Sequence, residues 1–353
     1  MADPGEKNVR NGEVRKNKFV LKNPAIEIIM KKGLSITWLL LALLLIICFH
    51  VQAQKQMAGI SGDLIIFHAG SLSVPMKEIA NEFNKIYPKV KILAESAGSV
   101  ASARKITDLN RPCDIMASAD YSVIDKMLIP KYADWNIKFA SNEMAIVYTS
   151  KSRHADKINS QNWYETLMKP DVAFGRADPN SDPCGYRTVM MLQLAEKYYK
   201  NPGLSKNIMA KDQEFNRPKE VDLLALLESE SIDYIFIYRS VAIQHNLKYL
   251  VLPDQVNLIN PAFANMYASA MVVINGSKPG AKEVITGEPM IYGVTILKDA
   301  PNKAAAEAFV AFMLSKNQGM KIMEKDGQPS VIPMPVQNFE KLPMKLKPFA
   351  TKK

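Results

Sequence analysis

The sequence is poor in the two side chains that most often ligate metals or act as nucleophiles: it has three cysteines and four histidines among 353 residues. Only Cys113 and Cys184 lie beyond residue 53. Two cysteines cannot form the disulfide framework that stabilises small secreted domains, so a hydrophobic core must hold the fold. We expect both thiols to be free.

The signatures of common catalytic sites are also missing. Beyond residue 53 the histidines are His68, His154 and His245, and none has metal-ligand spacing to another histidine or cysteine. The chain has no Gly-x-Ser-x-Gly nucleophile motif and no phosphate-loop signature. A nucleophile–base pair of Cys184 with a distant histidine is an alternative, but no spacing supports it. The sequence therefore argues against an enzyme.

The excess of positive charge does not point to nucleic acid. The formal net charge is +10 at pH 7, and part of it comes from the N-terminal segment. The remaining lysines are scattered along the chain instead of forming a basic cluster. A solvated basic surface is the simpler interpretation.

The one long apolar run lies near the N-terminus, from Trp38 to Phe49. Lys31-Lys32 precede it and Val51-Gln52-Ala53 follows, which is the order of a signal peptide. The run is shorter than the roughly 20 residues of a membrane-spanning helix. We expect residues 30–53 to be a signal peptide, residues 1–29 a non-native upstream extension, and the mature protein to lie outside the cytoplasm. The alternative is an uncleaved signal that tethers the protein to the cell membrane.

Strand and helix patterns alternate along the rest of the chain. The expected strands are Leu64–Phe67, Val90–Leu93, Asp114–Met116, Met144–Tyr148, Val172–Phe174, Tyr234–Tyr238, Met271–Ile274 and Ile291–Ile296. The expected helices are Pro75–Tyr87, one through Val100, Ala103 and Ile106, then Tyr186–Tyr199, Val221–Leu227, Lys303–Leu314 and Gln318–Lys325. This order predicts an α/β fold with largely parallel sheets flanked by helices.

We expect two lobes with a ligand cleft between them. The first lobe is assigned to residues 61–140 together with 290–343, and the second to residues 141–289. The chain would then cross twice, near Ser141-Asn142 and near Tyr292-Gly293, and two crossings form a hinge. A disulfide between Cys113 and Cys184 would prevent such a hinge from opening, which is why free thiols are expected.

Four loops deliver polar groups to the start of an expected helix. They are Ala69-Gly70-Ser71-Leu72-Ser73, Ala97-Gly98-Ser99, Asp182-Pro183-Cys184-Gly185 and Pro218-Lys219-Glu220-Val221. The N-terminus of a helix presents unpaired N–H groups and the positive end of the helix dipole, so it can hold an anion. At the carboxyl ends of strands in α/β sheets, such loops bind ligands. Four of them around one cleft would form an anion-binding cage.

Each position in these loops also has a purely structural interpretation. Ser71 and Ser99 can be helix caps, and Asp182 before Pro183 has the form of an N-cap followed by proline at the first helical position. Glu220 in a first turn suits the helix dipole, and Tyr238 at the end of a strand can be a packed tyrosine.

The order of these segments resembles that of the periplasmic molybdate- and tungstate-binding proteins, and more closely the archaeal-type tungstate/molybdate binders. The matching segments are His68-Ala69-Gly70-Ser71-Leu72, Ala97-Gly98-Ser99, Cys113-Asp114-Ile115-Met116-Ala117-Ser118-Ala119-Asp120, Asp178-Pro179-Asn180-Ser181-Asp182-Pro183-Cys184-Gly185-Tyr186-Arg187 and Ile237-Tyr238-Arg239-Ser240-Val241-Ala242. The resemblance covers roughly residues 62–335 and implies a type II periplasmic-binding-protein fold.

The resemblance also implies roles for individual residues. Ser71 and Ser99, with Gly70 in the same loop, would donate hydrogen bonds to the oxyanion from the first lobe. From the second lobe, the backbone N–H groups of Cys184 (after Pro183) and Val221 and the phenol of Tyr238 would do the same. Asp182 and Glu220 would ligate the metal centre of the oxyanion, giving six-coordination. Asp222 is an alternative to Glu220.

Two carboxylates beside a dianion should repel it, unless they bond directly to its electron-poor metal. Tungsten and molybdenum can expand their coordination, whereas sulfur and phosphorus cannot, so the carboxylates would reject sulfate and phosphate. The implied partners are the permease and ATPase of an ABC importer, with a monomeric receptor and no resident cofactor. A receptor for sulfate, phosphate or an organic anion stays open as an alternative, as does a structural or adhesive surface protein. The sequence does not rank tungstate over molybdate.

Overall fold

The computed structural model describes residues 59–276 and 280–353. The expected signal peptide and the upstream extension lie outside these residues. Ile60–Lys353 form one compact unit. Among the described residues, no helix has both the length and the apolar character that a membrane crossing requires.

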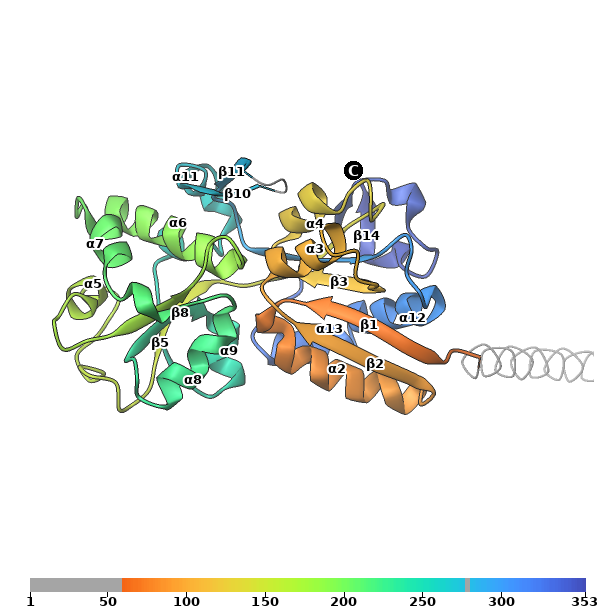
Figure 1. The fold of residues 1–353 in the computed structure, drawn as a ribbon, viewed down its shortest axis with the longest axis horizontal. Helices are drawn as coiled ribbons and strands as arrows, with labels where there is room; N and C mark the ends of the chain where they lie inside the picture. The colour runs from red at the N-terminus through yellow and green to blue at the C-terminus, as the bar shows by residue number, and fades with distance from the viewer. Residues whose placement is uncertain (1–58, 277–279) are drawn as a thin grey trace, which may run out of the picture. The chain divides into compact units, whose positions relative to one another are not determined.

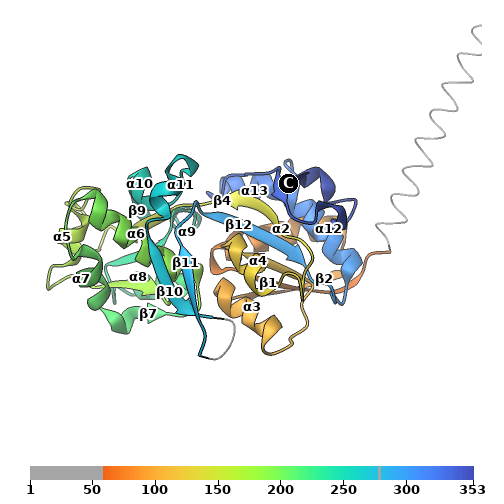
Figure 2. The ribbon, with the colours of Figure 1, turned by 90° about the horizontal axis from the view of Figure 1, so that it is seen from above.

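Two five-stranded sheets organise this unit, and each is the centre of one lobe (Figures 1 and 2). The first lobe contains the strands β1 (Gly62–His68), β2 (Val90–Ser96), β3 (Ile115–Ser118), β4 (Ile137–Ser141) and β12 (Ile291–Ile296), in the order β2-β1-β3-β12-β4. The second contains β5 (Met144–Tyr148), β6 (Phe174–Ala177), β7 (Asn216–Arg217), β8 (Tyr234–Tyr238) and β9 (Lys248–Val251), in the order β7-β6-β8-β5-β9. The α/β class expected from the sequence is confirmed.

In each sheet a single strand runs against the other four. In the first sheet it is β12, which is antiparallel to both of its neighbours, β3 and β4. In the second sheet it is β5, which is antiparallel to β8 and β9. The remaining neighbours pair in parallel. The chain enters each lobe from the other through one of these two strands, β5 or β12. Because each of them is antiparallel to its neighbours, the otherwise parallel sheets are mixed.

Helices surround the sheets. In the first lobe they are α2 (Ser73–Ile86), α3 (Ser99–Thr107), α4 (Tyr121–Met127), α12 (Lys303–Leu314) and α13 (Gly319–Lys325). In the second lobe they are α5 (Trp163–Leu167), α6 (Pro183–Tyr198), α7 (Leu204–Ala210), α8 (Leu223–Glu228), α9 (Arg239–Gln244), α10 (Asp254–Asn257) and α11 (Ala264–Tyr267). The hairpin of β10 (Met271–Asn275) and β11 (Lys282–Thr286) also packs on α6, and β13 (Met334–Val336) pairs with β14 (Ala350–Lys352).

The core explains why the central strands form where they do. All five residues of β5 and all five of β8 are buried, as expected for continuous apolar runs covered on both faces. The edge strand β2, by contrast, is largely exposed. Cys113 and Cys184 are both buried and free.

The direction of the strands decides where the polar loops meet. The carboxyl ends of the parallel strands in each sheet point toward the crossings between the lobes, because β12 and β5 start there. The loops after β1, β2 and β3 therefore face the loops after β6, β7 and β8. This is the position at which α/β sheets bind ligands.

Candidate functional site

Two buried carboxyl groups from separate loops of the second lobe lie side by side. Asp182 is the N-cap of α6: its Oδ1 accepts a hydrogen bond from the Cys184 N–H at 2.8 Å, and Pro183 follows as the first helical residue. Its other oxygen, Oδ2, accepts from the Glu220 N–H at 3.1 Å. Asp182 and Glu220 are each only 1 % exposed. The structural interpretation of Asp182 as a cap is therefore correct, and its second oxygen positions Glu220.

The side chain of Glu220 reaches the first lobe. Its Oε1 accepts a hydrogen bond from the Ser71 N–H at 2.5 Å, at the start of the short 3-10 helix η1 (Gly70–Leu72). The carboxyl group also packs on Gly70, where a Cβ would lie 2.5 Å from Oε2. Only glycine leaves room for this contact. Glu220 Oε2 has no hydrogen-bond partner among the described residues.

Burial and mutual repulsion disfavour the ionised form of this pair. Burial raises the pKa of Glu220 well above its usual range, and the charge of Asp182 raises it further. Burial also raises the pKa of Asp182, against the Glu220 side chain and the N–H groups of Cys184 and Glu220, which act in the opposite direction. A positively polarised centre between the two carboxyl groups would relieve both penalties.

Three hydroxyl groups complete the surroundings, and Ser71, Ser99 and Tyr238 are all fully buried. Ser99 Oγ accepts from the Ala119 N–H at 3.0 Å, and the Tyr238 hydroxyl accepts from Arg187 Nη1 at 3.3 Å. Each of these two oxygens therefore keeps its own proton free to donate to a ligand. Ser71 Oγ lies 2.8 Å from the Tyr292 hydroxyl.

The capping interpretation of the two serines is wrong. The residue before α3 is Gly98, and neither α3 nor η1 has a side-chain cap. Gly98 instead allows a close approach of the lobes, because a Cβ there would lie 2.3 Å from the Ser181 carbonyl oxygen. The Ser99 hydroxyl can therefore contact the loop after β3 and the space between the lobes.

The structure brings together the residues that the sequence singled out, except Asp222, and two of them, Cys184 and Val221, need a qualification. The Cys184 N–H is already engaged by Asp182 Oδ1. Val221, in the second 3-10 helix η3 (Glu220–Asp222), is half-buried and lines an open groove of about 620 Å³ together with Gly70. Asp222, the alternative to Glu220, is exposed and lies 3.2 Å from the Lys219 ammonium group, so it is not at the site.

Sequence reasoning assigned no role to Asp120 or Arg187, although both belong to the quoted motifs. Asp120 caps α4 through the Ser122 N–H, and its Oδ2 accepts from the Tyr186 hydroxyl at 2.5 Å. Arg187 Nη2 lies 3.3 Å from the same oxygen, and Nη1 donates to the Ala119 carbonyl at 2.7 Å. Burial acts to lower the pKa of Arg187, but Asp120 together with the Tyr238 and Tyr186 hydroxyls outweighs it and raises that pKa. The opposite charges of Asp120 and Arg187, in two separate motifs, are the feature of the sequence that could have indicated this ion pair.

A second group of residues that sequence reasoning missed lies at the crossing between β4 and β5. Asn142 Nδ2 donates to the Ser240 hydroxyl at 2.7 Å and to the Tyr292 hydroxyl at 2.8 Å. Gln328 Nε2 donates to the Ser71 carbonyl at 3.0 Å. The loop that carries Ser71 is therefore held by Gln328 and by Tyr292, and Asn142 in turn donates to the Tyr292 hydroxyl.

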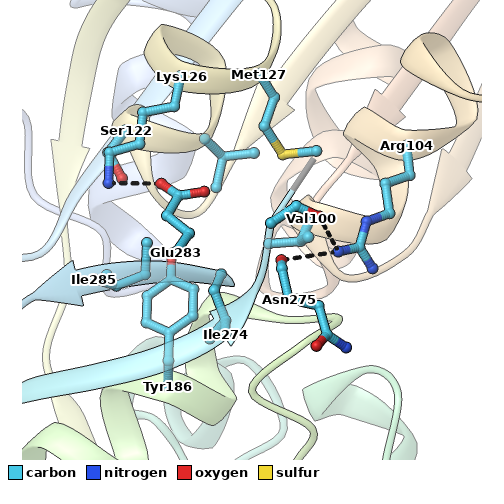
Figure 3. Close-up of a pocket in the computed structure, with 12 residues that line it drawn as sticks. Val100, Arg104, Ser122, Lys126, Met127, Tyr186, Ile274, Asn275, Glu283 and Ile285 are labelled. Atoms are coloured by element: carbon cyan, nitrogen blue, oxygen red, sulfur yellow. Dashed lines mark hydrogen bonds and ion pairs between the residues drawn. The ribbon is translucent and has the colours of Figure 1, made fainter. Parts of the chain in front are cut away.

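The β10–β11 hairpin makes a separate contact between the lobes, shown in Figure 3. Arg104 of α3 donates to the Asn275 carbonyl at 3.1 Å, and Lys126 of α4 lies 3.0 Å from Glu283. Apolar side chains line the space between them, among them Val100. Neither Asp182 nor Glu220 lines this space.

No group of three or more His, Cys, Asp or Glu side chains arranged to hold a metal ion is present in residues 59–276 and 280–353. What these residues offer is a pair of carboxyl groups with hydroxyl and N–H donors around them. That arrangement can surround a small oxyanion whose central atom accepts two further oxygen ligands.

The sequence matches known proteins along most of its length. The family model described as bacterial extracellular solute-binding protein matches residues 64–328. An uncharacterized solute-binding protein of Petrotoga mobilis is 49 % identical over 291 residues, which are 82 % of this chain and 90 % of that protein. The molybdate/tungstate-binding protein WtpA of Pyrococcus abyssi is 40 % identical over 331 residues, covering 86 % of this chain and 94 % of WtpA.

Solved structures share the fold at low sequence identity. The periplasmic molybdate-binding protein of Azotobacter vinelandii aligns with a TM-score of 0.56 at 18 % identity, over 76 % of this chain and 99 % of that one. The sulfate-binding protein SubI of Mycobacterium tuberculosis aligns with a TM-score of 0.54 at 13 % identity, over 77 % of this chain and 87 % of that one. At these identities the likeness concerns the two-lobed fold alone.

Proposed function

Because the chain belongs to the family of bacterial extracellular solute-binding proteins, we propose that it captures tungstate or molybdate and delivers it to an ABC importer. The observation that carries this proposal is the buried pair Asp182 and Glu220, two acids in contact with each other, one of which also contacts the first lobe. Relatives that carry the name molybdate/tungstate-binding protein are 40 % and 41 % identical to the chain.

The two carboxyl groups select the ligand by the chemistry of its central atom. As free charges they would repel any dianion, and each already has a raised pKa from burial. Bonded to a hexavalent metal they become oxygen ligands and complete an octahedron around it. Sulfur and phosphorus in their oxyanions accept no further ligands, so sulfate and phosphate would meet only the repulsion.

The remaining groups hold the oxygens of the anion. Ser99 and Tyr238 each have a hydroxyl proton to donate, from opposite lobes. Val221 adds a backbone N–H, and the Ser71 N–H becomes available if Glu220 turns from it toward the metal. Binding from both lobes favours the closed arrangement, as in other hinged receptors.

The other parts of the proposal concern the cell and the partners. Residues 30–53 direct the chain out of the cytoplasm. The mature protein works outside the cytoplasm as a monomer, which is either secreted or tethered to the cell membrane. It delivers the anion to the permease of the importer, whose ATPase drives uptake. The binding protein itself carries out no chemical step.

Isothermal titration with tungstate, molybdate, sulfate and phosphate tests the proposal. We expect saturable binding of tungstate and molybdate, with sulfate and phosphate weaker by about a hundredfold or more, or about 2.7 kcal/mol. Sulfate or phosphate binding as tight as tungstate binding would instead support the alternative of a general anion receptor.

A further inference from the structure

The strongest polar connection between the lobes, apart from Glu220, centres on a buried ion pair. Asp120, in the loop after β3 of the first lobe, is 2 % exposed, and so is Arg187, in the first turns of α6 of the second lobe. Arg187 Nη2 lies 3.3 Å from Asp120 Oδ2, and the neighbouring Tyr186 hydroxyl donates to the same oxygen at 2.5 Å. Separation of the lobes would break all of these contacts at once.

The same arginine also connects two hydroxyls expected to hold the anion. Arg187 Nη1 donates to the Tyr238 hydroxyl at 3.3 Å and to the Ala119 carbonyl at 2.7 Å. The N–H of Ala119 in turn donates to Ser99 Oγ at 3.0 Å. A continuous chain of contacts therefore runs from Ser99 of the first lobe through Ala119 and Arg187 to Tyr238 of the second.

From this geometry we infer that Arg187 and Asp120 are positioning residues that couple capture of the anion to closure of the lobes. When the lobes close, Arg187 fixes the orientation of Tyr238 and, through Ala119, that of Ser99. An anion held by both hydroxyls stabilises the same arrangement. This inference rests on the proposed function and deepens it by naming residues that set affinity without touching the ligand.

A simpler role for Arg187 predicts an effect of opposite sign. If the guanidinium acted only as a positive charge near the anion, removing the negative charge of Asp120 would raise anion affinity. If the ion pair holds the lobes together, the same change lowers affinity and weakens closure. Asp120→Asn makes this distinction well, because asparagine has the same shape and still caps α4.

Arg176 provides a matched control. It is also buried in the second lobe, but it donates to the carbonyls of Met209 and Lys211 in that same lobe. Arg187→Lys and Arg176→Lys make the same chemical change at two buried arginines. Only the first removes a guanidinium group that contacts residues of both lobes. Circular dichroism establishes that each variant is folded.

The experiment combines titration with tungstate and small-angle scattering with and without tungstate. We expect Asp120→Asn and Arg187→Lys to bind tungstate at least tenfold more weakly and to show reduced compaction. Arg176→Lys should bind and compact like the wild type. Wild-type or higher affinity of Asp120→Asn, with unchanged compaction, would overturn the inference. If one variant failed to fold, the other would decide.

The outcome separates this inference from the proposed function. If the wild type bound none of tungstate, molybdate, sulfate and phosphate, the proposed function would fail. If the wild type bound tungstate, but Asp120→Asn and Arg187→Lys both kept its affinity and compaction, the proposed function would stand and only the inference would be overturned.

Discussion

The Ser71 N–H donates to Glu220 Oε1 at 2.5 Å, so a carboxyl group of the second lobe occupies the start of a helix in the first. This is where an anionic ligand of the first lobe would bind, because the unpaired N–H groups of a helix start there. Under the proposed function, Glu220 would exchange one partner, the Ser71 N–H, for another, the metal of the oxyanion.

The carboxyl pair can be tested by replacing both acids with their amides. The double variant Asp182→Asn and Glu220→Gln should weaken the binding of tungstate and molybdate. The expected loss of binding free energy is on the order of a few kcal/mol for each lost metal bond. Sulfate binding should strengthen, because the amides remove the repulsion and donate hydrogen bonds. X-ray absorption should show six-coordinate tungsten in the wild type and four-coordinate tungsten in the variant. Four-coordinate tungsten in the wild type would mean that Asp182 acts only as a helix cap.

Gly70→Ala should displace Glu220 without changing any charge. The new Cβ would lie 2.5 Å from Glu220 Oε2 and 2.8 Å from its Cδ, so the carboxyl group must move. Tungstate affinity should fall about tenfold or more, or about 1.4 kcal/mol, as measured by titration.

Gly203→Ala is the control for this change. A Cβ at Gly203 meets nothing nearer than Asn207 Nδ2 at 3.8 Å, but its φ of +86° strains alanine. It should lower stability by about 1 kcal/mol and leave affinity unchanged. Equal affinities for the two variants would show that Glu220 tolerates the displacement.

The ligand-free protein should reveal Glu220 through the pH dependence of its stability. Since burial and Asp182 raise the pKa of this group in the folded state, its contribution is retained at low pH and lost as pH rises through the folded-state pKa. Glu220→Gln has no such loss. The melting temperature of the variant relative to the wild type should therefore increase from pH 5 to pH 8, by about 2 °C or more.

Asp233→Asn offers a comparison for that measurement. Asp233 is also buried, but it is paired with Arg153, whose Nη2 lies 2.7 Å away. Its replacement removes the charged partner of Arg153, so this variant should melt below the wild type throughout the pH range. Parallel melting curves of wild type and Glu220→Gln across the pH range would mean that Glu220 carries no unfavourable charge.

The two buried thiols should resist modification in the native state. Burial raises the pKa of Cys113 to about 12 and that of Cys184 well above 9. At pH 8 both groups are therefore thiols, and the thiolate is the form that reacts. Ellman's reagent should label both sites at least a thousandfold more slowly than in the unfolded protein, with peptides identified by mass spectrometry. Fast labelling of Cys184 alone would indicate an opening of α6 from its sheet.

Local patterns were sufficient to predict some elements residue by residue. The strand Tyr234–Tyr238 and the helix Lys303–Leu314 have the predicted bounds. The strand is a continuous apolar run, and the helix starts after Asn302, whose side chain accepts from the Ala305 N–H. The loop at Asp182-Pro183 likewise contains its own helix-start signal.

Other features depend on contacts that no local pattern reveals. The strands β4 and β9 were not predicted: β4 includes Lys138 and Ser141, and β9 is mostly exposed or half-exposed, so neither is a continuous apolar run. Asp120 and Arg187 are far apart in sequence and meet only when two lobes come together. Nor does a sequence reveal that Ser99 would accept from Ala119 instead of capping its own helix. The bounds of the two lobes and the roles of the site residues stay predictions.

The position of β12 has a consequence for biosynthesis. This strand lies between β3 and β4, although nearly 150 residues separate it from β4 in the chain. A nascent chain that has not yet produced Ile291–Ile296 therefore leaves both neighbours with unpaired edges, while every strand of the β5–β9 sheet is already complete. During synthesis or export from the N-terminus, the middle of the sequence can fold first, and the lobe that begins the protein is the last to be finished.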